Sequence, residues 1–207
     1  MHPNPIFHDV DKARNIAFAR QRAFGVLAVN GEEGPSISHV PFLLNEDAST
    51  AELHLVRSNP IARMGEGPLP AKIVVSGSDS YVSPDWYGLP DQVPTWNYIA
   101  VHLTGQLEKL SQEKLRDVLD RLSENFEKQL LPKPPWAAAK MTPEALEKMM
   151  RMIVPFRFTV TGVDGTWKLG QNKVEQARVD AAGQMAEKGI GTEVAALAEM
   201  MRNLDHR

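Results

Sequence analysis

The sequence contains no cysteine among its 207 residues. This absence excludes disulfides, thiolate metal sites and cysteine nucleophiles. No stretch approaches the roughly 18 apolar residues that a membrane-spanning helix needs. The first five residues (MHPNP) carry neither the basic nor the apolar part of a secretion signal. We therefore expect a cytoplasmic protein with no membrane partner.

The chain also lacks an excess of positive charge. It has 23 Lys and Arg residues and 26 Asp and Glu residues, for a net charge of -3. A dedicated nucleic-acid binder usually carries a basic excess or a dense basic stripe. The composition therefore argues against nucleic acid as a partner. Hydrophobic residues make up 43% of the chain, enough for a core, and we expect one domain spanning residues 1–207.

Several catalytic signatures are missing. The sequence has no phosphate loop and no dinucleotide fingerprint, and residues 77–80 (GSDS) lack the flanking pattern of a nucleophile elbow. The six histidines show neither HxxH nor HxxxH spacing, so we predict no metal site. No residue stands out as a general acid or base, and the catalytic residues stay unassigned.

Alternating and apolar runs predict six short strands. They lie at residues 24–29, 36–44, 52–57, 71–77, 97–107 and 156–162, with a turn at residues 164–165. Helices are predicted at residues 9–24, with Asp9 as the N-cap, at 111–131, after Thr142, at 172–188 and at 192–205.

The fold class that follows is α+β. Short antiparallel strands in this number usually close into a barrel. We expect a six-stranded antiparallel barrel with a helical insertion at about residues 111–152 and C-terminal helices at about 172–205. Side chains fill so narrow a barrel, and a ligand must therefore bind outside it, often at a subunit interface.

The first candidate site is the segment 57–63 (RSNPIAR), which follows the third predicted strand. Guanidinium groups, a hydroxyl and turning backbone amides form the mixture that phosphate recognition needs. Arg57 and Arg63 are close enough in the chain to reach one anion. The alternative is an ordinary solvated strand end.

The second candidate is the segment 168–173 (KLGQNK), in which Lys168 and Lys173 flank an amide pair before a predicted helix. The N-terminus of that helix favours an anion. The alternative is that Asn172 is a plain helix N-cap.

The third candidate is an aromatic loop that is braced by prolines. Five of the chain's 14 Phe, Trp and Tyr residues fall within it, namely Tyr81, Trp86, Tyr87, Trp96 and Tyr98. Thr95 and Asn97 add uncharged polar groups. Such a cluster fits either a planar ligand or a minicore beneath a long loop.

The motifs YVSPDWY (81–87) and VPTWNY (93–98) resemble those of the PaiB-like FMN-binding negative transcriptional regulators. Further matching stretches are PIF (5–7), HVPFLL (39–44), VRSNP (56–60), VH (101–102) and KLGQNK (168–173). The resemblance covers roughly residues 1–175. It implies an FMN-binding split barrel related to pyridoxamine-phosphate oxidases, and a homodimer with FMN in the groove between its subunits.

The resemblance also implies roles for individual residues. Contacts to the phosphate and ribityl chain would come from Arg57, Ser58, Asn59 and Arg63. The residues beside the flavin, or supporting its loop, would be Thr95, Trp96 and Asn97. Four more would arrive from the same or the partner subunit: Lys168, Gln171, Asn172 and Lys173.

Two positions depart from the family pattern. Gly170 stands where the family usually has serine, which removes one hydroxyl donor, and Leu53 precedes His54 where a glycine is usual. Neither change removes a charged contact, and water can replace a hydroxyl.

Three functions remain open. The first is a flavin-dependent oxidoreductase of low specificity that acts on a small molecule or takes electrons from NAD(P)H, because the cofactor carries the redox chemistry. The second is an FMN-binding regulator or sensor that acts through a partner or through DNA, as the family name implies. The third is a haem-binding split barrel, in which His39, His54 or His102 would be the axial ligand.

Overall fold

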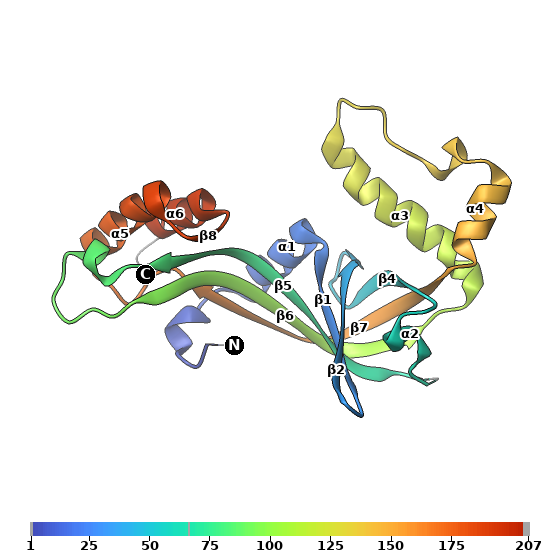
Figure 1. Ribbon diagram of the computed structural model, residues 1–207, viewed down its shortest axis with the longest axis horizontal. Coiled ribbons are helices and arrows are strands. Elements are labelled where there is room, and N and C mark those ends of the chain that lie inside the picture. Colours follow the sequence, from blue (N-terminus) through green and yellow to red (C-terminus); the bar gives the residue numbers. More distant parts are fainter. Residues whose placement is uncertain (1, 66, 205–207) are drawn as a thin grey trace. The chain divides into compact units, whose positions relative to one another are not determined.

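The computed structural model describes residues 2–65 and 67–204, which form two compact units. The smaller unit comprises residues 1–15, 76–101 and 164–207, and the larger unit comprises residues 16–75 and 102–163. Helix α1 (Lys12–Arg22) and strands β5 (Leu69–Val82), β6 (Thr95–Lys109) and β7 (Ile153–Lys168) each continue from one unit into the other (Figure 1). The prediction of one domain over residues 1–207 stays a prediction.

Antiparallel strands form the framework of the larger unit. β1 (Phe24–Gly31) and β2 (Gly34–Pro41) make a hairpin with continuous register from Phe24↔Pro41 to Gly31↔Gly34. β1 also pairs with β5, and β4 (Thr50–Val56) pairs with both β3 (Leu43–Leu44) and β7. The strand order along the sheet is β2-β1-β5-β6-β7-β4-β3. β2 also lies close to β4, as a split barrel requires.

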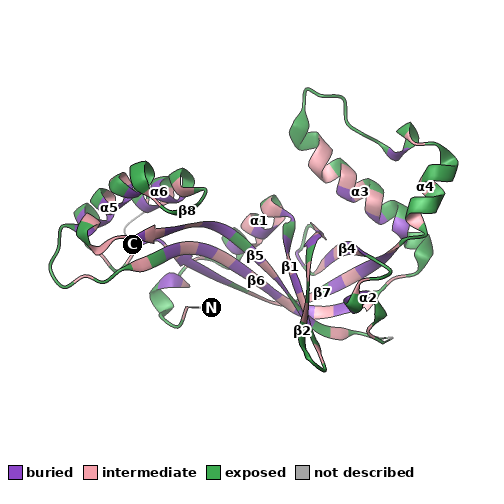
Figure 2. Ribbon diagram, in the orientation of Figure 1, coloured by how far each residue is buried: buried purple, intermediate pink, exposed green. Residues whose placement is uncertain are grey.

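Strand β6 shows how the sequence pattern builds the core. Its residues alternate between buried and half-exposed from Asn97 to Glu108 (Figure 2), which is the two-residue period of a strand with one covered face. Leu103 and Leu107 are fully buried, and Gly105 lies between them on the same face. A Cβ at Gly105 would approach the Thr159 carbonyl oxygen to 2.1 Å, so this position requires glycine.

The insertion predicted at about residues 111–152 is helical, as expected. Its helices are α3 (Leu115–Glu127) and α4 (Pro143–Met150). α3 buries Leu115, Val118 and Leu122 and lies close to β3 and β4. An ion pair between Arg121 and Glu52 also joins α3 to β4. α2 (Pro60–Arg63) is a single short helical turn that follows β4.

In the smaller unit, two C-terminal helices pack against each other. They are α5 (Glu175–Lys188) and α6 (Val194–Arg202). α5 buries Ala181 and Met185, and α6 buries Leu197 and Met201. Between these helices, β8 (Gly191–Thr192) pairs with β5 at Asp79 and Ser80.

The α+β antiparallel fold with its insertion and helical tail is confirmed, but the sheet has eight strands rather than six. One extra strand arises because the strand predicted at residues 36–44 is interrupted at Phe42 and so divides into β2 and β3. The other, β8, is only two residues long, too short to give an alternating pattern. The turn predicted at residues 164–165 is wrong, because both residues lie within β7. Among the described residues, no helix is long and apolar enough to cross a membrane.

Two helix starts also differ from the prediction. α1 begins at Lys12 rather than Asp9, because the Asp11 carboxylate accepts a hydrogen bond from the Arg14 backbone N–H at 2.6 Å and so caps the first turn. α5 begins at Glu175 rather than at residue 172, and its N-cap is Val174.

Candidate functional site

Lys168 is the last residue of β7, in the smaller unit, and its side chain is half-buried. Its ammonium group donates a hydrogen bond to the Thr95 hydroxyl at the start of β6. The same ammonium lies 5.7 Å from the centre of the Phe7 ring. Three segments of the chain that are far apart in sequence thus meet around one cation.

Lys173 provides a second half-buried cation in the same unit. It donates a hydrogen bond to the Gln92 side-chain oxygen, and its ammonium lies 4.9 Å from the centre of the Tyr87 ring. We call Lys168 and Lys173 the lysine pair. Their partners are neutral oxygens and aromatic faces, which hold a cation in place without cancelling its charge.

The positive charges of the lysine pair are not neutralised by nearby carboxylates within the described residues. Burial, and after it the positive charge of Lys173, lower the pKa of Lys168. Within the part of the chain that the structure describes, neither lysine forms an ion pair with a carboxylate. A bound anion would relieve both the repulsion between these ammonium groups and their loss of hydration.

A tight turn at residues 167–171 holds the lysine pair in place. The Gln171 side chain accepts a hydrogen bond from the Leu169 backbone N–H at 2.8 Å and donates one to the Trp167 carbonyl. Its amide therefore fixes the turn, rather than facing a ligand as expected. Asn172 is exposed and is not the N-cap of α5, so the alternative of a plain cap is wrong.

Gly170 in this turn has φ +83°, a conformation that a residue with a Cβ adopts only at a cost of about 1–2 kcal/mol. We expect Gly170→Ala to lower the free energy of unfolding by about that amount. Gly183 is the matched control, because it lies inside α5 with open space around its Cβ position. Gly183→Ala should raise stability by roughly 0.5–1 kcal/mol. Chemical denaturation measures both, and equal effects would contradict the assignment of strain to Gly170.

The residues of the aromatic loop differ in their burial. Tyr87 is 3% exposed in the 3-10 turn Pro84–Tyr87, which packs against α5. Asn97 is 1% exposed and donates a hydrogen bond to the Met201 sulfur at 3.4 Å. The burial of these two residues agrees with a minicore beneath the loop, and the bond of Asn97 agrees with the expectation that it supports the loop.

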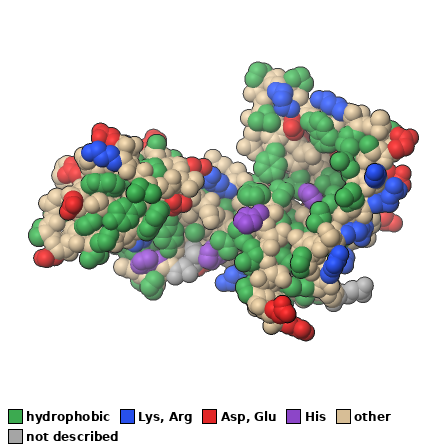
Figure 3. Space-filling view, in the orientation of Figure 1, with side chains coloured by type: hydrophobic (Ala, Val, Ile, Leu, Met, Phe, Trp, Pro, Cys, Tyr) green, Lys and Arg blue, Asp and Glu red, His purple; other side chains and the backbone are tan. Residues whose placement is uncertain are grey.

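Other side chains of the aromatic loop are exposed to solvent. Trp96 is 46% exposed, and its ring meets the Tyr81 ring edge-on at 6.3 Å between centroids. Val93 and Leu89 are exposed nearby in sequence. Figure 3 shows hydrophobic side chains gathered on one face of the smaller unit. This face can receive a flat apolar group.

The segment 57–63 belongs to the larger unit, and its side chains are partly engaged. The Arg57 guanidinium donates to the Arg151 carbonyl at 2.7 Å and to the Gln112 side-chain oxygen at 2.6 Å. Arg63 donates to the Arg57 carbonyl at 3.3 Å. Both guanidinium groups are exposed, as is Ser58.

Asn59 has a structural role in this segment. Its side-chain oxygen accepts from the Ile61 backbone N–H at 2.9 Å and so caps α2. Its side-chain nitrogen donates to the Ser38 hydroxyl at 3.1 Å. The phosphate contact expected of Asn59 is thus replaced by these internal bonds, which leave Arg57, Ser58 and Arg63 as the exposed donors of the segment.

The three histidines considered for haem all lie in the larger unit. His39 is exposed and stacks on Phe24 at 6.4 Å. His54 is half-buried, its Nδ1 atom is buried without a hydrogen-bond partner, and burial lowers its pKa. Among the described residues, no three His, Cys, Asp or Glu side chains are grouped to hold a metal ion.

Comparison with known proteins identifies the family. Residues 1–162 match the family described as "Putative FMN-binding domain". The chain belongs to this family. It is also 30% identical over 174 residues to the "Protease synthase and sporulation protein PAI 2" of Bacillus subtilis, covering 83% of each chain.

Solved structures agree on the fold of this FMN-binding-domain family member. The FAD and heme binding protein from Mycobacterium smegmatis matches with a TM-score of 0.58 and 14% identity, covering 88% of this chain and 80% of that one. The flavocytochrome Anf3 from Azotobacter vinelandii matches with a TM-score of 0.53 and 13% identity, covering 82% and 73%. The split-barrel fold predicted from the sequence is thereby confirmed.

The structure distributes the expected site residues over the two units. The larger unit holds Arg57, Ser58, Asn59 and Arg63, and the smaller unit holds Thr95, Trp96, Asn97, Lys168, Gln171, Asn172 and Lys173. Sequence reasoning missed Gln92 and Phe7, whose contacts with the lysine pair span many residues along the chain and leave no local pattern.

Proposed function

We propose that this chain binds FMN and that the lysine pair receives the phosphate. The observation that carries the proposal is the pair itself: two half-buried ammonium groups whose partners, among residues 2–65 and 67–204, are all neutral. A phosphate monoester carries about -1.5 to -2 charges near neutral pH, which matches the two cations. Hydrogen bonds between charged partners are also the stronger ones. Family membership supports the choice of a flavin phosphate.

The ring of the flavin would lie against the aromatic loop. The Thr95 hydroxyl that Lys168 contacts directly precedes the exposed Trp96 in β6. One short segment therefore supplies both a contact to the cations and an apolar surface, the combination that small-molecule sites usually show.

We further propose that the protein is a homodimer. The exposed side chains of Leu89, Val93 and Trp96 belong to one stretch of the smaller unit, and exposed apolar patches commonly mark interfaces. A second copy would cover this face and shield the flavin. Light scattering of the FMN-loaded protein tests the assembly, since a monomeric holoprotein would exclude the dimer.

The proposed activity is that of a flavin-dependent oxidoreductase which uses a small-molecule substrate or NAD(P)H. Bound FMN would supply the acceptance and release of hydride, and this chain's residues would bind, orient and shield it. The absorption spectrum of the purified protein tests cofactor choice directly, because an oxidised-flavin band supports the proposal and a Soret band supports haem. Bleaching of the flavin band by NAD(P)H would then separate an enzyme from a sensor.

FMN affinity should fall as pH rises, and Lys168 is the cause. Burial and Lys173 lower the pKa of Lys168 in the free protein, and a bound phosphate would raise it again by favouring the charged form. At a pH above the lowered pKa, Lys168 therefore has to take up a proton when FMN binds. The affinity for FMN decreases as the pH rises through this range. The free protein shows the opposite trend. Its stability rises with pH through the same range, because the unfolded chain holds this proton more tightly.

FMN titrations from about pH 7, above the phosphate's own titration near pH 6, up to the ordinary lysine pKa of 10.5 measure this dependence. Lys168→Met is the matched variant, as it keeps the length of the side chain and removes the ionisation. The variant should bind FMN more weakly than the wild type and lose most of the pH dependence. A slope that survives in Lys168→Met would assign the titration to another group.

A further inference from the structure

One loop of the smaller unit already supplies an oxygen atom to the lysine pair. Residues 88–94 connect the 3-10 turn Pro84–Tyr87 to β6, and the Gln92 side-chain oxygen accepts the hydrogen bond that Lys173 donates. The Gln92 side-chain nitrogen donates to the Pro90 carbonyl at 2.8 Å, which fixes the orientation of the amide. An amide oxygen is a neutral acceptor, whereas a phosphate oxygen would form the stronger, charge-assisted hydrogen bond with the same ammonium.

The loop 88–94 has few other attachments. Among the described residues, no other side-chain hydrogen bond or ion pair links residues 89–94 to another element. Gln92 is half-buried, whereas the other residues from Leu89 to Pro94 are exposed. Segments with few buried contacts have low local stability. The contact of Gln92 with Lys173 is therefore what chiefly holds this loop in place.

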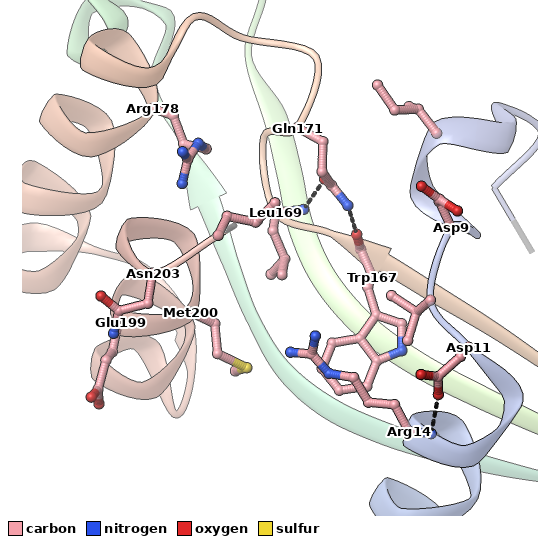
Figure 4. Close-up of a pocket in the computed structure, with 13 residues that line it drawn as sticks. Asp9, Asp11, Arg14, Trp167, Leu169, Gln171, Arg178, Glu199, Met200 and Asn203 are labelled. Atoms are coloured by element: carbon pink, nitrogen blue, oxygen red, sulfur yellow. Dashed lines mark hydrogen bonds between the residues drawn. The ribbon is translucent and has the colours of Figure 1, made fainter. Parts of the chain in front are cut away.

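The lysine side of the contact is held more firmly. The Lys173 ammonium lies 4.9 Å from the centre of the Tyr87 ring, which is buried in a turn that packs against α5. The two hydrogen bonds of the Gln171 side chain fix the preceding turn (Figure 4). Trp167, Leu169 and Gln171 of that turn also line a cavity of about 470 Å³, to which the lysine pair does not contribute. If a phosphate took over Lys173, the loop rather than the lysine would therefore move.

We propose that Gln92 competes with the flavin phosphate for Lys173, and that the phosphate displaces Gln92 and releases the loop 88–94. This inference rests on the proposed function, because it takes the lysine pair as the phosphate site. In the exchange, Lys173 gives up a neutral acceptor and gains a charged one, and the Gln92 amide returns to water. The affinity for FMN is then lower than it would be without Gln92, since the binding-competent state must first open.

Gln92→Leu tests the proposal by the sign of its effect. The variant removes the competing oxygen and keeps a side chain of similar size, so it should bind FMN about fivefold more tightly than the wild type, as expected for one net hydrogen bond. Its affinity for riboflavin, which has no phosphate, should stay the same. If Gln92 instead orients Lys173 toward the phosphate, the variant will bind FMN more weakly. That result, or an unchanged FMN affinity, would overturn the proposal.

Gln92→Glu tests the same competition in the opposite direction. A carboxylate at this position would hold Lys173 by a charge-assisted bond, so FMN should bind at least about tenfold more weakly than to the wild type. An FMN affinity equal to that of the wild type would contradict the competition.

Gln184→Leu is the matched control for both variants. Gln184 is an exposed glutamine of α5 that accepts a hydrogen bond from Lys188 at 3.3 Å, rather than from the lysine pair, and its replacement should leave FMN affinity unchanged. The wild type separates this inference from the proposed function. Equal binding of FMN and riboflavin by the wild type would overturn the phosphate contact and the competition together. A wild-type preference for FMN with no gain in Gln92→Leu would overturn the competition alone.

Discussion

Replacing both Lys168 and Lys173 by alanine should weaken FMN binding by at least about a hundredfold, or roughly 3 kcal/mol. Each charge-assisted hydrogen bond contributes about 1.5–3 kcal/mol, and the lysine pair would make two such bonds to the phosphate. The hydrogen bonds that the lysines donate within the described part of the chain go to the neutral groups of Thr95 and Gln92, so replacing both lysines leaves no carboxylate there without its partner. Equilibrium dialysis or quenching of flavin fluorescence measures the affinity.

Two comparisons make this result specific. Lys188→Ala removes an exposed lysine of the same unit that, like Lys173, donates to a glutamine side chain, Gln184, and it should bind FMN as the wild type does. Arg57→Ala combined with Arg63→Ala tests the other cation group, which the family resemblance assigns to the phosphate. A large loss in the arginine variant with none in the lysine variant would transfer the phosphate to the segment 57–63.

Trp167→Ala should lower the free energy of unfolding by about 3–5 kcal/mol, as truncation of a large buried aromatic does. Trp167 is 4% exposed, Arg14 stacks on its ring, and its N–H donates to Asn15. Asn15 is itself 5% exposed, so the variant also leaves a buried oxygen without this donor. Chemical denaturation followed by circular dichroism gives the value.

Trp167→Phe separates the ring from its hydrogen bond. It retains an aromatic side chain beside Arg14 and loses the N–H, so the expected decrease is about 1–3 kcal/mol. An alanine variant that loses less than about 1 kcal/mol would show that this end of β7 is not a packed centre of the smaller unit.

Much of the fold was predictable because its strands obey a local rule. β6 alternates over most of its length, and β1 and β2 overlap the strands predicted at residues 24–29 and 36–44 and pair in one continuous register. The two-residue strand β8 exists only through pairing with the distant strand β5, and two residues are too few to show an alternating pattern. The start of α1 differs from the prediction because Asp11, rather than Asp9, accepts a hydrogen bond from a backbone N–H.

The candidate site was predictable by residue type but not by role. The sequence singled out Asn59 and Gln171 as ligand contacts and Asn97 as a residue beside the flavin or supporting its loop. In the structure the side chain of Asn59 caps α2, that of Asn97 bonds to α6 and that of Gln171 fixes a turn. Amides suit both tasks, and only the three-dimensional partners decide between them. Lys168 and Lys173 could be selected from sequence because cations near a helix start suggest an anion.

The cavity beside Trp167 was not predicted from the sequence. Its lining comes from the N-terminal segment, the end of β7 and the C-terminal helices. Only Leu169 and Gln171 belong to a stretch, residues 168–173, that the sequence marked as a candidate site. In the sequence, nothing distinguishes Arg14 from the other residues of the helix predicted at 9–24. Its importance arises from its distance to Trp167, 153 positions further along the chain.

The phosphate assignment is tested most directly by comparing FMN with riboflavin, which differ only in the phosphate. The wild-type protein should bind FMN at least about a hundredfold more tightly than riboflavin, and the variant that lacks both Lys168 and Lys173 should bind the two with nearly equal affinity. If the wild type does not bind FMN saturably, or if its preference for FMN survives the loss of both lysines, the account is wrong.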